Sequence, residues 1–175
     1  MLAEGGPGTL TMDALAQRSC LGKGTVFRRF GTRPGIFQAL LDDDERAFQE
    51  RVLAGPPPLG PGGSPLQRLI AYGQARIRFL VEHRDIARAA LDGRQRIPVG
   101  AQSPLSQSHI RMLLGQLDLG PCDLDILAVQ LTAALDGPLL LYLSASDLAS
   151  SPDAMSRQLA AGWQELVQRV CRPPA

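Results

Sequence analysis

The sequence predicts an all-α protein with two helical domains. Apolar residues recur at helical spacing through most of the 175 residues, and no stretch alternates with the period of two that marks a strand. Serine, threonine and proline stand where these apolar stripes begin, as helix caps and first-turn residues do. A proline- and glycine-rich stretch, 54–65, separates a basic first part from an apolar second part. We therefore expect one domain at 1–53 and another at 54–175.

The first domain begins with two short helices on either side of a tight turn. Thr11 is a good N-cap for the first, whose apolar residues follow at positions i, i+3 and i+4 of one face. Residues 19–22 interrupt it, and a second helix runs from about Lys23 to Phe30, before a longer one that ends near residue 53. This is the pattern of a helix-turn-helix. The side chains expected to point inward around the turn and the second helix are Leu21, Val26, Phe27 and Phe30.

Positive charge gathers in this helix-turn-helix. The whole chain has a net charge of only +1, so any nucleic-acid footprint must be local. Five cations between residues 11 and 33 stand against Asp13 alone, which gives the segment a charge of +4. They are Arg18, Lys23, Arg28, Arg29 and Arg33. A basic helix after a tight turn is typical of a module that places one helix in a DNA groove.

Two charged features also have plainer interpretations. The basic stretch would fit two helices of an unrelated bundle with a solvated basic face. The four carboxylates of the acidic run at 42–45 suggest a divalent-metal site. Consecutive residues point around a helix and do not converge on one ion, so we favour a solvated helix face for this run.

The second domain is predicted to contain five helices. The first begins after the Ser64 cap and continues to about residue 81. The helix at 123–143 is apolar on more than one side, which indicates a helix buried all round or shared with a partner. The other helices are expected at 85–91, from 103 or 104 through 117, and at 152–170, with an irregular stretch at 93–104.

Cysteine usage and the apolar stretches favour a cytoplasmic protein. The three cysteines, Cys20, Cys122 and Cys171, are far apart and odd in number, which argues against a disulfide framework or a zinc site. The first residues lack the basic-then-apolar pattern of a signal peptide. The apolar region 124–143 contains two aspartates and a proline, so we expect a buried helix there rather than a membrane span.

No group of residues points to catalysis, a cofactor or a bound metal. Neither His83 nor His109 has a partner at i+4 or a nearby carboxylate–cysteine set. Three serines before His109, at 103, 106 and 108, form no GxSxG-type nucleophile motif. Cys20 beside a basic helix suggests an oxidant sensor, but a small residue that fills the turn is the simpler interpretation. We therefore expect a protein that is not an enzyme.

A whole helix-turn-helix pattern agrees in order and spacing with one known family. It comprises TMDALA at 11–16, LGKGTVFRRF at 21–30, and Arg33 with the Ile-Phe pair at 36–37. This stretch resembles the DNA-binding region of the TetR family of bacterial transcriptional regulators. The rest of the chain is similar to that family only in length, helix count and the apolar character of the last two helices.

The resemblance implies DNA-binding roles at the matching positions. Thr11 would cap the first helix of the motif and bond a phosphate. Lys23 and Thr25 would lie at the start of the recognition helix, where side chains face base edges or nearby phosphates. Arg28 would point outward from the same helix.

Several positions depart from the family pattern. Phe27 stands where the family usually has tyrosine, and it could stack on a sugar or a thymine methyl. Arg29 replaces a histidine that contacts the DNA backbone, and Arg33 replaces a lysine that grips phosphate. Cys20 replaces the usual turn glycine, and Gly22 the usual serine-type cap.

The family also has a full helix before the motif, where here only Met1 to Glu4 could contribute. We therefore expect the helix-turn-helix core to lose apolar cover. The residues affected would be Leu15, Val26, Phe30 and Phe37. This expectation motivates an alternative function, a helical ligand-binding or interaction protein that has lost DNA binding.

For the second domain, the resemblance implies effector binding and dimerisation. A homodimer would form through the last two helices, and a small apolar ligand would bind among the helices between residues 66 and 119. The ligand would change affinity for operator DNA, most commonly in a repressor. Residues expected to line the cavity are Tyr72, Arg76, Phe79, Met112, Gln116 and Tyr142, although each alone also fits ordinary packing.

Overall fold

The computed structural model describes residues 6–90, 104–144 and 151–172. These ranges are helical and contain no strand, which confirms the predicted all-α class. The elements are η1 (Pro7–Thr9), α2 (Met12–Arg18), α3 (Lys23–Phe30), α4 (Arg33–Ala54), α5 (Pro65–Glu82), α6 (Arg84–Ala90), α7 (Pro104–Leu114), α8 (Leu124–Ser144) and α9 (Pro152–Val170).

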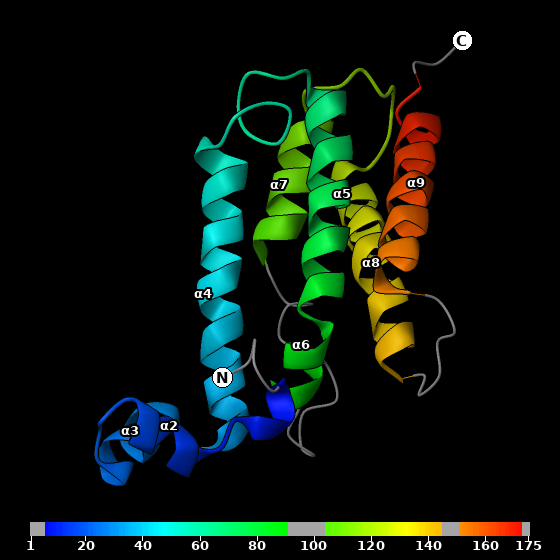
Figure 1. Ribbon diagram of the computed structural model, residues 1–175. Coiled ribbons are helices and arrows are strands. Elements are labelled where there is room, and N and C mark those ends of the chain that lie inside the picture. Colours follow the sequence, from blue (N-terminus) through cyan, green and yellow to red (C-terminus); the bar gives the residue numbers. More distant parts are fainter. Residues whose placement is uncertain (1–5, 91–103, 145–150, 173–175) are drawn as a thin grey trace.

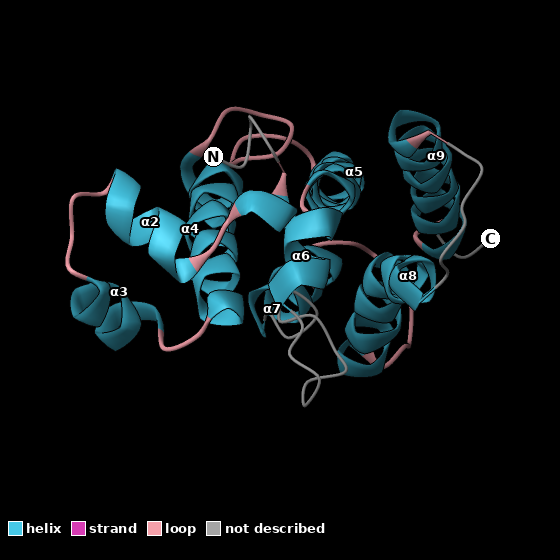
Figure 2. Cartoon of the chain, turned by 60° about the horizontal axis from the view of Figure 1, so that its bottom comes forward, coloured by secondary structure: helices cyan, strands magenta, loops and turns pink. Residues whose placement is uncertain are grey.

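The long helix α4 connects the helix-turn-helix to the helical body. Figure 1 shows α2 and α3 at one end of α4, apart from the other helices. In the body, α4 lies on one side of α5, and α8 and α9 lie on the other side. Figure 2 shows the same order from below, with α3 at one edge and α8 and α9 at the opposite edge.

Side-chain caps fix where several of these helices begin. Thr11, Thr32, Ser64 and Ser151 each accept a hydrogen bond from the backbone N–H three residues further on. Ser64 also forms a capping box, because its own N–H donates to the side chain of Gln67 at 3.4 Å. The predicted starts of α2, α5 and α9 are therefore confirmed.

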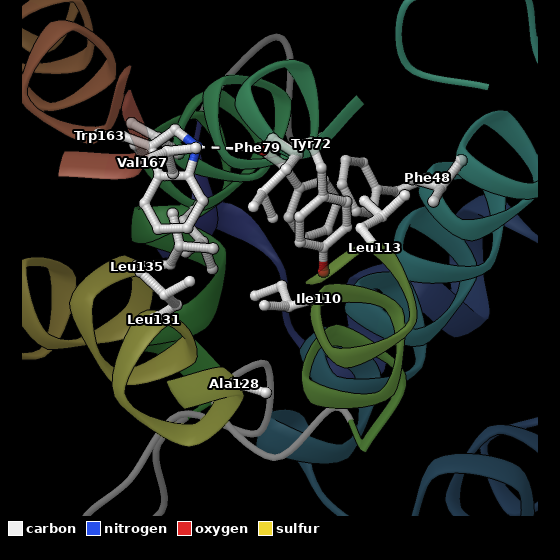
Figure 3. Close-up of a cluster of buried hydrophobic side chains, with 14 of the residues drawn as sticks. Phe48, Tyr72, Phe79, Ile110, Leu113, Ala128, Leu131, Leu135, Trp163 and Val167 are labelled. Atoms are coloured by element: carbon white, nitrogen blue, oxygen red, sulfur yellow. Dashed lines mark hydrogen bonds between the residues drawn. The ribbon is translucent and has the colours of Figure 1, made fainter. Parts of the chain in front are cut away.

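The main core is built around α5, and α9 packs closely on it (Figure 3). Trp163 of α9 is buried, and its indole N–H donates to the Leu69 carbonyl oxygen at 3.2 Å. Gly73 makes this approach possible, since a Cβ at that position would lie 2.0 Å from the Trp163 indole nitrogen. A glycine in the middle of a helix is thus explained by a packing requirement.

A smaller core supports the helix-turn-helix. Leu10, Ile36 and Phe37 are buried together, and residues of α6 pack against them. Val26 is 1% exposed and Phe37 fully buried, so the expected loss of apolar cover is wrong for these two residues. Phe37 is covered by Leu10 and by α6, which lies far along the sequence. The other two residues in question, Leu15 and Phe30, are half-buried.

Three further expectations need correction or lie outside the described residues. Leu21 and Phe27 are 50% and 51% exposed rather than inward, since Val26 occupies the inward position of α3 and the next residue points about 100° further around the helix. α7 ends at Leu114 instead of residue 117, because the N–H groups of Gln116 and Leu117 bond carbonyls only three residues back. The stretches 1–5 and 91–103 lie outside the described residues.

Replacing Gly73 with alanine tests the contact between α5 and α9. Alanine favours a helix interior by about 1 kcal/mol over glycine, so propensity alone predicts a more stable protein. We expect the free energy of unfolding to fall by about 2 kcal/mol instead, because the added methyl group would overlap the Trp163 indole. Urea titration followed by the fluorescence of this single tryptophan measures the change.

Gly24→Ala in α3 is the matched control, since nothing lies within 4 Å of its added Cβ. Its free energy of unfolding should stay level or rise slightly. A Gly73→Ala protein with wild-type stability and fluorescence would contradict the close approach of α9 to α5.

Candidate DNA-binding surface and ligand pocket

The turn between α2 and α3 has the backbone geometry of a glycine turn. Cys20 has a φ of +55°, in the left-handed region, where a side chain costs about 1–2 kcal/mol. This is the position at which the resembled family usually has glycine. Gly22 then caps α3 without a side-chain hydrogen bond. Thr11 caps α2, with its Oγ1 accepting from the Ala14 N–H at 3.1 Å.

The outer face of α3 is cationic and exposed. Lys23 pairs with Asp13 of α2 at 2.9 Å, but the two side chains are 68% and 67% exposed. A pair this exposed contributes at most ~1 kcal/mol, so it does not prevent Lys23 from meeting a phosphate. The residues of α3 predicted to contact DNA are all exposed: Lys23, Thr25, Phe27, Arg28 and Arg29.

Arg33 binds the segment before α2. Its Nε donates to the Leu10 carbonyl oxygen at 2.7 Å and its Nη2 to the Pro7 carbonyl oxygen at 2.6 Å. The guanidinium also lies over the Phe37 ring, 5.1 Å from the centroid. The side chain therefore holds η1 against the start of α4, and its predicted grip on a phosphate stays a prediction.

A pocket of about 200 Å³ opens between α4, α5 and α7. Its walls are almost entirely apolar, and two of the predicted ligand residues, Tyr72 and Met112, are part of them. The full lining is Glu45, Phe48, Gln49, Val52, Leu53, Tyr72, Leu105, Ser108, His109 and Met112.

The other predicted ligand residues lie outside this lining. Arg76 and Phe79 are buried behind it, and Gln116 is exposed beyond the end of α7. The side chain of Tyr142 is outside the described residues. The sequence analysis does not predict the pocket wall formed by α4. Phe48 and Val52, spaced i and i+4, indicate an apolar inner face on this helix.

Behind the pocket, a buried ion pair joins α4 to α5. Arg76 is 0% exposed, and its Nη1 lies 2.5 Å from Oε2 of Glu45. The guanidinium also lies 5.7 Å and 5.3 Å from the ring centroids of Phe48 and Phe79. Asp136 of α8 is buried nearby, where desolvation raises the pKa of its carboxyl and the charge of Arg76 opposes that shift.

His109 is the polar residue in the pocket wall that lacks a partner. It is 8% exposed, and its Nε2 is buried without a hydrogen bond to any described residue. Burial, with a smaller effect of the Arg68 charge, lowers the pKa of this imidazole to about 4. The ring is therefore neutral near pH 7. The neighbouring Tyr72, in contrast, donates its hydroxyl to Ser106 Oγ at 2.6 Å.

α8 and α9 lie at one edge of the body (Figures 1 and 2), and both helices have exposed apolar side chains. Ile126 and Val129 of α8 are 54% and 47% exposed, and Leu166 of α9 is 36% exposed. On the opposite face of α8, Leu131 and Leu135 are buried in the main core. α8 is therefore apolar on both faces, as the sequence predicts.

The carboxylates of the acidic run make contacts within the chain. Each of these carboxylates contacts a different side chain: Asp42 with Gln38, Asp43 with Arg46, Asp44 with His83, and Glu45 with Arg76. Among the described residues, no group of three or more His, Cys, Asp and Glu side chains could hold a metal ion. In the same part of the chain, no helix combines the length and apolar character needed to span a bilayer.

Comparison with known proteins identifies the fold. No family model matches the sequence, and no curated protein matches it. A bacterial regulatory protein in the tetR family from Rhodococcus RHA1 has a similar structure, with a TM-score of 0.57 and 17% identity over 99% of this chain and 92% of that one. A candidate fatty acid metabolism regulator from Clostridium perfringens has a TM-score of 0.55 and 17% identity, over 99% and 94% of the two chains. The chain has the fold of a TetR-family regulator, which confirms the predicted resemblance at the level of the fold.

Because His109 is buried in its neutral form, it should make stability depend on pH. Its pKa is about 4 in the folded chain, against an ordinary value of 6.5. Between these values the unfolded chain binds the extra proton, so the free energy of unfolding falls as the pH is lowered. We expect this residue to account for a loss of about 2 kcal/mol between pH 7 and pH 4.5.

Urea titrations of the wild type and of His109→Phe at both pH values measure this contribution. The carboxylates titrate in both proteins and cancel in the comparison, so the variant should lose less stability at pH 4.5. Equal pH dependences in the two proteins would show that folding leaves the imidazole pKa unchanged.

Proposed function

We propose that this protein is a DNA-binding transcriptional regulator that acts as a homodimer and responds to a small ligand. The observation that carries the proposal is the exposed cationic face of α3 at the outer end of α4, on a chain with the TetR-regulator fold. Repression, the commoner outcome in the resembled family, is the mode we propose.

The outer face of α3 has the surface of a recognition helix. Lys23 and Thr25, in its first turn, are placed to reach base edges or phosphates, and Arg28 and Arg29 to hold phosphates beside them. The exposed Phe27 ring offers an apolar contact to a sugar or a thymine methyl. Phosphate contacts would supply much of the affinity, and base contacts the sequence preference.

The uncovered apolar faces of α8 and α9 support a homodimer. Each chain would contribute both helices to a four-helix interface that buries Ile126, Val129 and Leu166. A two-fold interface uses the same surface on both partners, so one apolar face per chain is sufficient. The two recognition helices would then lie at the same end of the dimer and meet successive major grooves.

The position of the pocket supports a ligand response. α4 forms one pocket wall and continues directly into the helix-turn-helix. A ligand that fits better with α4 in one position would shift the population of that position. The change in DNA affinity is limited to the ligand's differential affinity for the two positions.

The alternative function, a helical ligand-binding protein that has lost DNA binding, predicts an unsupported helix-turn-helix. The burial of Val26 and Phe37 counts against it. A mobility-shift assay on DNA from around the protein's own gene separates the two functions. A specific complex at moderate salt supports the regulator, and the absence of one supports the alternative.

Lys23→Ala should weaken DNA binding and flatten its dependence on salt. The loss of one phosphate contact reduces the slope of log K against log salt by about 0.9. Asp13→Asn should strengthen binding, because it releases Lys23 from the 2.9 Å pair and removes a negative charge. Fluorescence anisotropy with labelled DNA at several salt concentrations measures both effects.

Arg46→Ala is the matched control for charge. It removes a cation from an exposed pair with Asp43 on α4, outside both α3 and the proposed interface. Its salt slope should equal that of the wild type. An equal loss of slope in the Lys23 and Arg46 variants would contradict a specific phosphate contact at Lys23.

Val129→Glu should convert the dimer into monomers. Two unpaired carboxylates buried at a two-fold interface would each carry a large desolvation cost. Sedimentation velocity measures the change in mass. Leu21→Glu is the control, since it places the same charge at another half-exposed apolar residue, outside α8 and α9, and should remain dimeric. A monomeric wild type, or a dimeric Val129→Glu protein, would overturn the interface.

A further inference from the structure

The pocket between α4, α5 and α7 has the size of one substituted aromatic ring. Its volume is about 200 Å³, and an apolar cavity of about 150 Å³ holds benzene. The ring of Tyr72 lies 5.9 Å from that of Phe48 and 4.9 Å from that of His109, between centroids, and all three residues line the pocket. These are normal spacings for aromatic pairs, so a ligand ring can join the cluster in the same manner.

The pocket favours a neutral ligand. Glu45 is the charged residue of its lining, and its carboxylate already binds Arg76 at 2.5 Å and the Gln49 amide at 3.2 Å. Among the described residues that line the pocket, none is a lysine or an arginine. An anionic ligand would therefore enter an apolar site beside a carboxylate, with no cation among the residues that line it.

His109 provides an anchor for one polar group of the ligand. Its buried Nε2 makes no hydrogen bond to a described residue, and a buried nitrogen without a partner gains from one that a ligand brings. Rotation of the imidazole by half a turn exchanges Nε2 with a ring carbon, so the nitrogen can be presented without backbone movement. A neutral imidazole nitrogen is a donor or an acceptor, depending on the tautomer. A hydroxyl satisfies either, because it can both donate and accept.

We infer that this pocket binds a neutral, single-ring aromatic alcohol of the phenol class, with its ring against Phe48 and Tyr72 and its hydroxyl on Nε2 of His109. The inference rests on the proposed function, because it assigns a ligand class to the effector site. The proposed site differs from a general apolar site because it requires the ligand hydroxyl. It differs from an acid-binding site because it excludes a carboxylate.

Isothermal titration of the full chain without DNA tests the ligand class. The probes are 4-methylphenol, toluene, which lacks the hydroxyl, and benzoate, which carries a charge. We expect 4-methylphenol to bind about tenfold more tightly than toluene, the ratio that one hydrogen bond supplies, and benzoate to bind more weakly than either. Equal affinities for 4-methylphenol and toluene, or tighter binding of benzoate, would overturn the inference.

Nitrogen NMR of the histidine rings tests the anchor. The chain has two histidines, His83 and His109, so the His83→Gln variant assigns their resonances. Addition of 4-methylphenol should shift the Nε2 resonance of His109 strongly, whereas toluene should leave it nearly unchanged. Equal shifts with both probes would show that the hydroxyl does not reach the ring nitrogen.

Two variants localise the effect. His109→Phe keeps an aromatic ring in the wall but removes the nitrogen, so the tenfold preference for 4-methylphenol should disappear. Gln116→Ala, on the exposed turn after α7, should retain it. The comparison of probes on the wild-type protein and the NMR shifts test the inference even if His109→Phe or Gln116→Ala fails to fold. Since every arm omits DNA, failure here leaves the mobility-shift result intact, and failure of DNA binding leaves the ligand result intact.

Discussion

The guanidinium of Arg76 has no access to solvent, and this buried charge constrains how the helices can be arranged. A buried ion is costly unless a counter-charge and hydrogen bonds accompany it, and α4 supplies the counter-charge through Glu45 at 2.5 Å. Two aromatic rings, Phe48 and Phe79, flank the cation. Nearer the end of α5, the ring of His83 approaches Asp44 of α4 at 3.1 Å. α4 therefore cannot leave α5 without separating a buried charge from its partner.

This constraint matters because α4 belongs to both cores of the molecule. Its first turns pack Ile36 and Phe37 with α6 and the segment before α2, whereas Phe48 and Val52 pack in the main core. Glu45 stands between these two regions, at once a partner of Arg76 and part of the pocket wall. In the proposed function, a ligand in the pocket would act on the same residues that hold α4, so a small displacement there would be carried along a rigid helix to α3. No separate relay of residues is needed.

The sequence was sufficient for features that depend on neighbouring residues. Thr11, Thr32, Ser64 and Ser151 mark helix starts because capping is local, and the exposed cations of α3 follow from its helical period.

The sequence was insufficient for features that depend on contacts between distant segments. For Arg76 the sequence permits two roles, because a polar-tipped side chain on the inner face of a helix can line a cavity or form a buried ion pair. Only the position of Glu45, 31 residues earlier, identifies the ion pair. In the sequence His109 is only an isolated histidine, since its burial in the pocket wall depends on how α7 lies against α5. Phe37 is covered by α6, and nothing in the sequence of α6 predicts that it packs there.

Arg33 shows how structural and electrostatic roles can coexist in one side chain. Two of its donors bond the Pro7 and Leu10 carbonyl oxygens, and these bonds hold Leu10 over Phe37, where the resembled family has a full helix. Carbonyl oxygens are dipoles and do not cancel a positive charge, so the cation still contributes to the potential around the start of α4. Its field would attract the phosphate backbone at a distance, while Lys23, Arg28 and Arg29 remain exposed for direct contacts. The charges counted along the sequence therefore describe the electrostatic field of this surface better than they identify which cations would contact DNA.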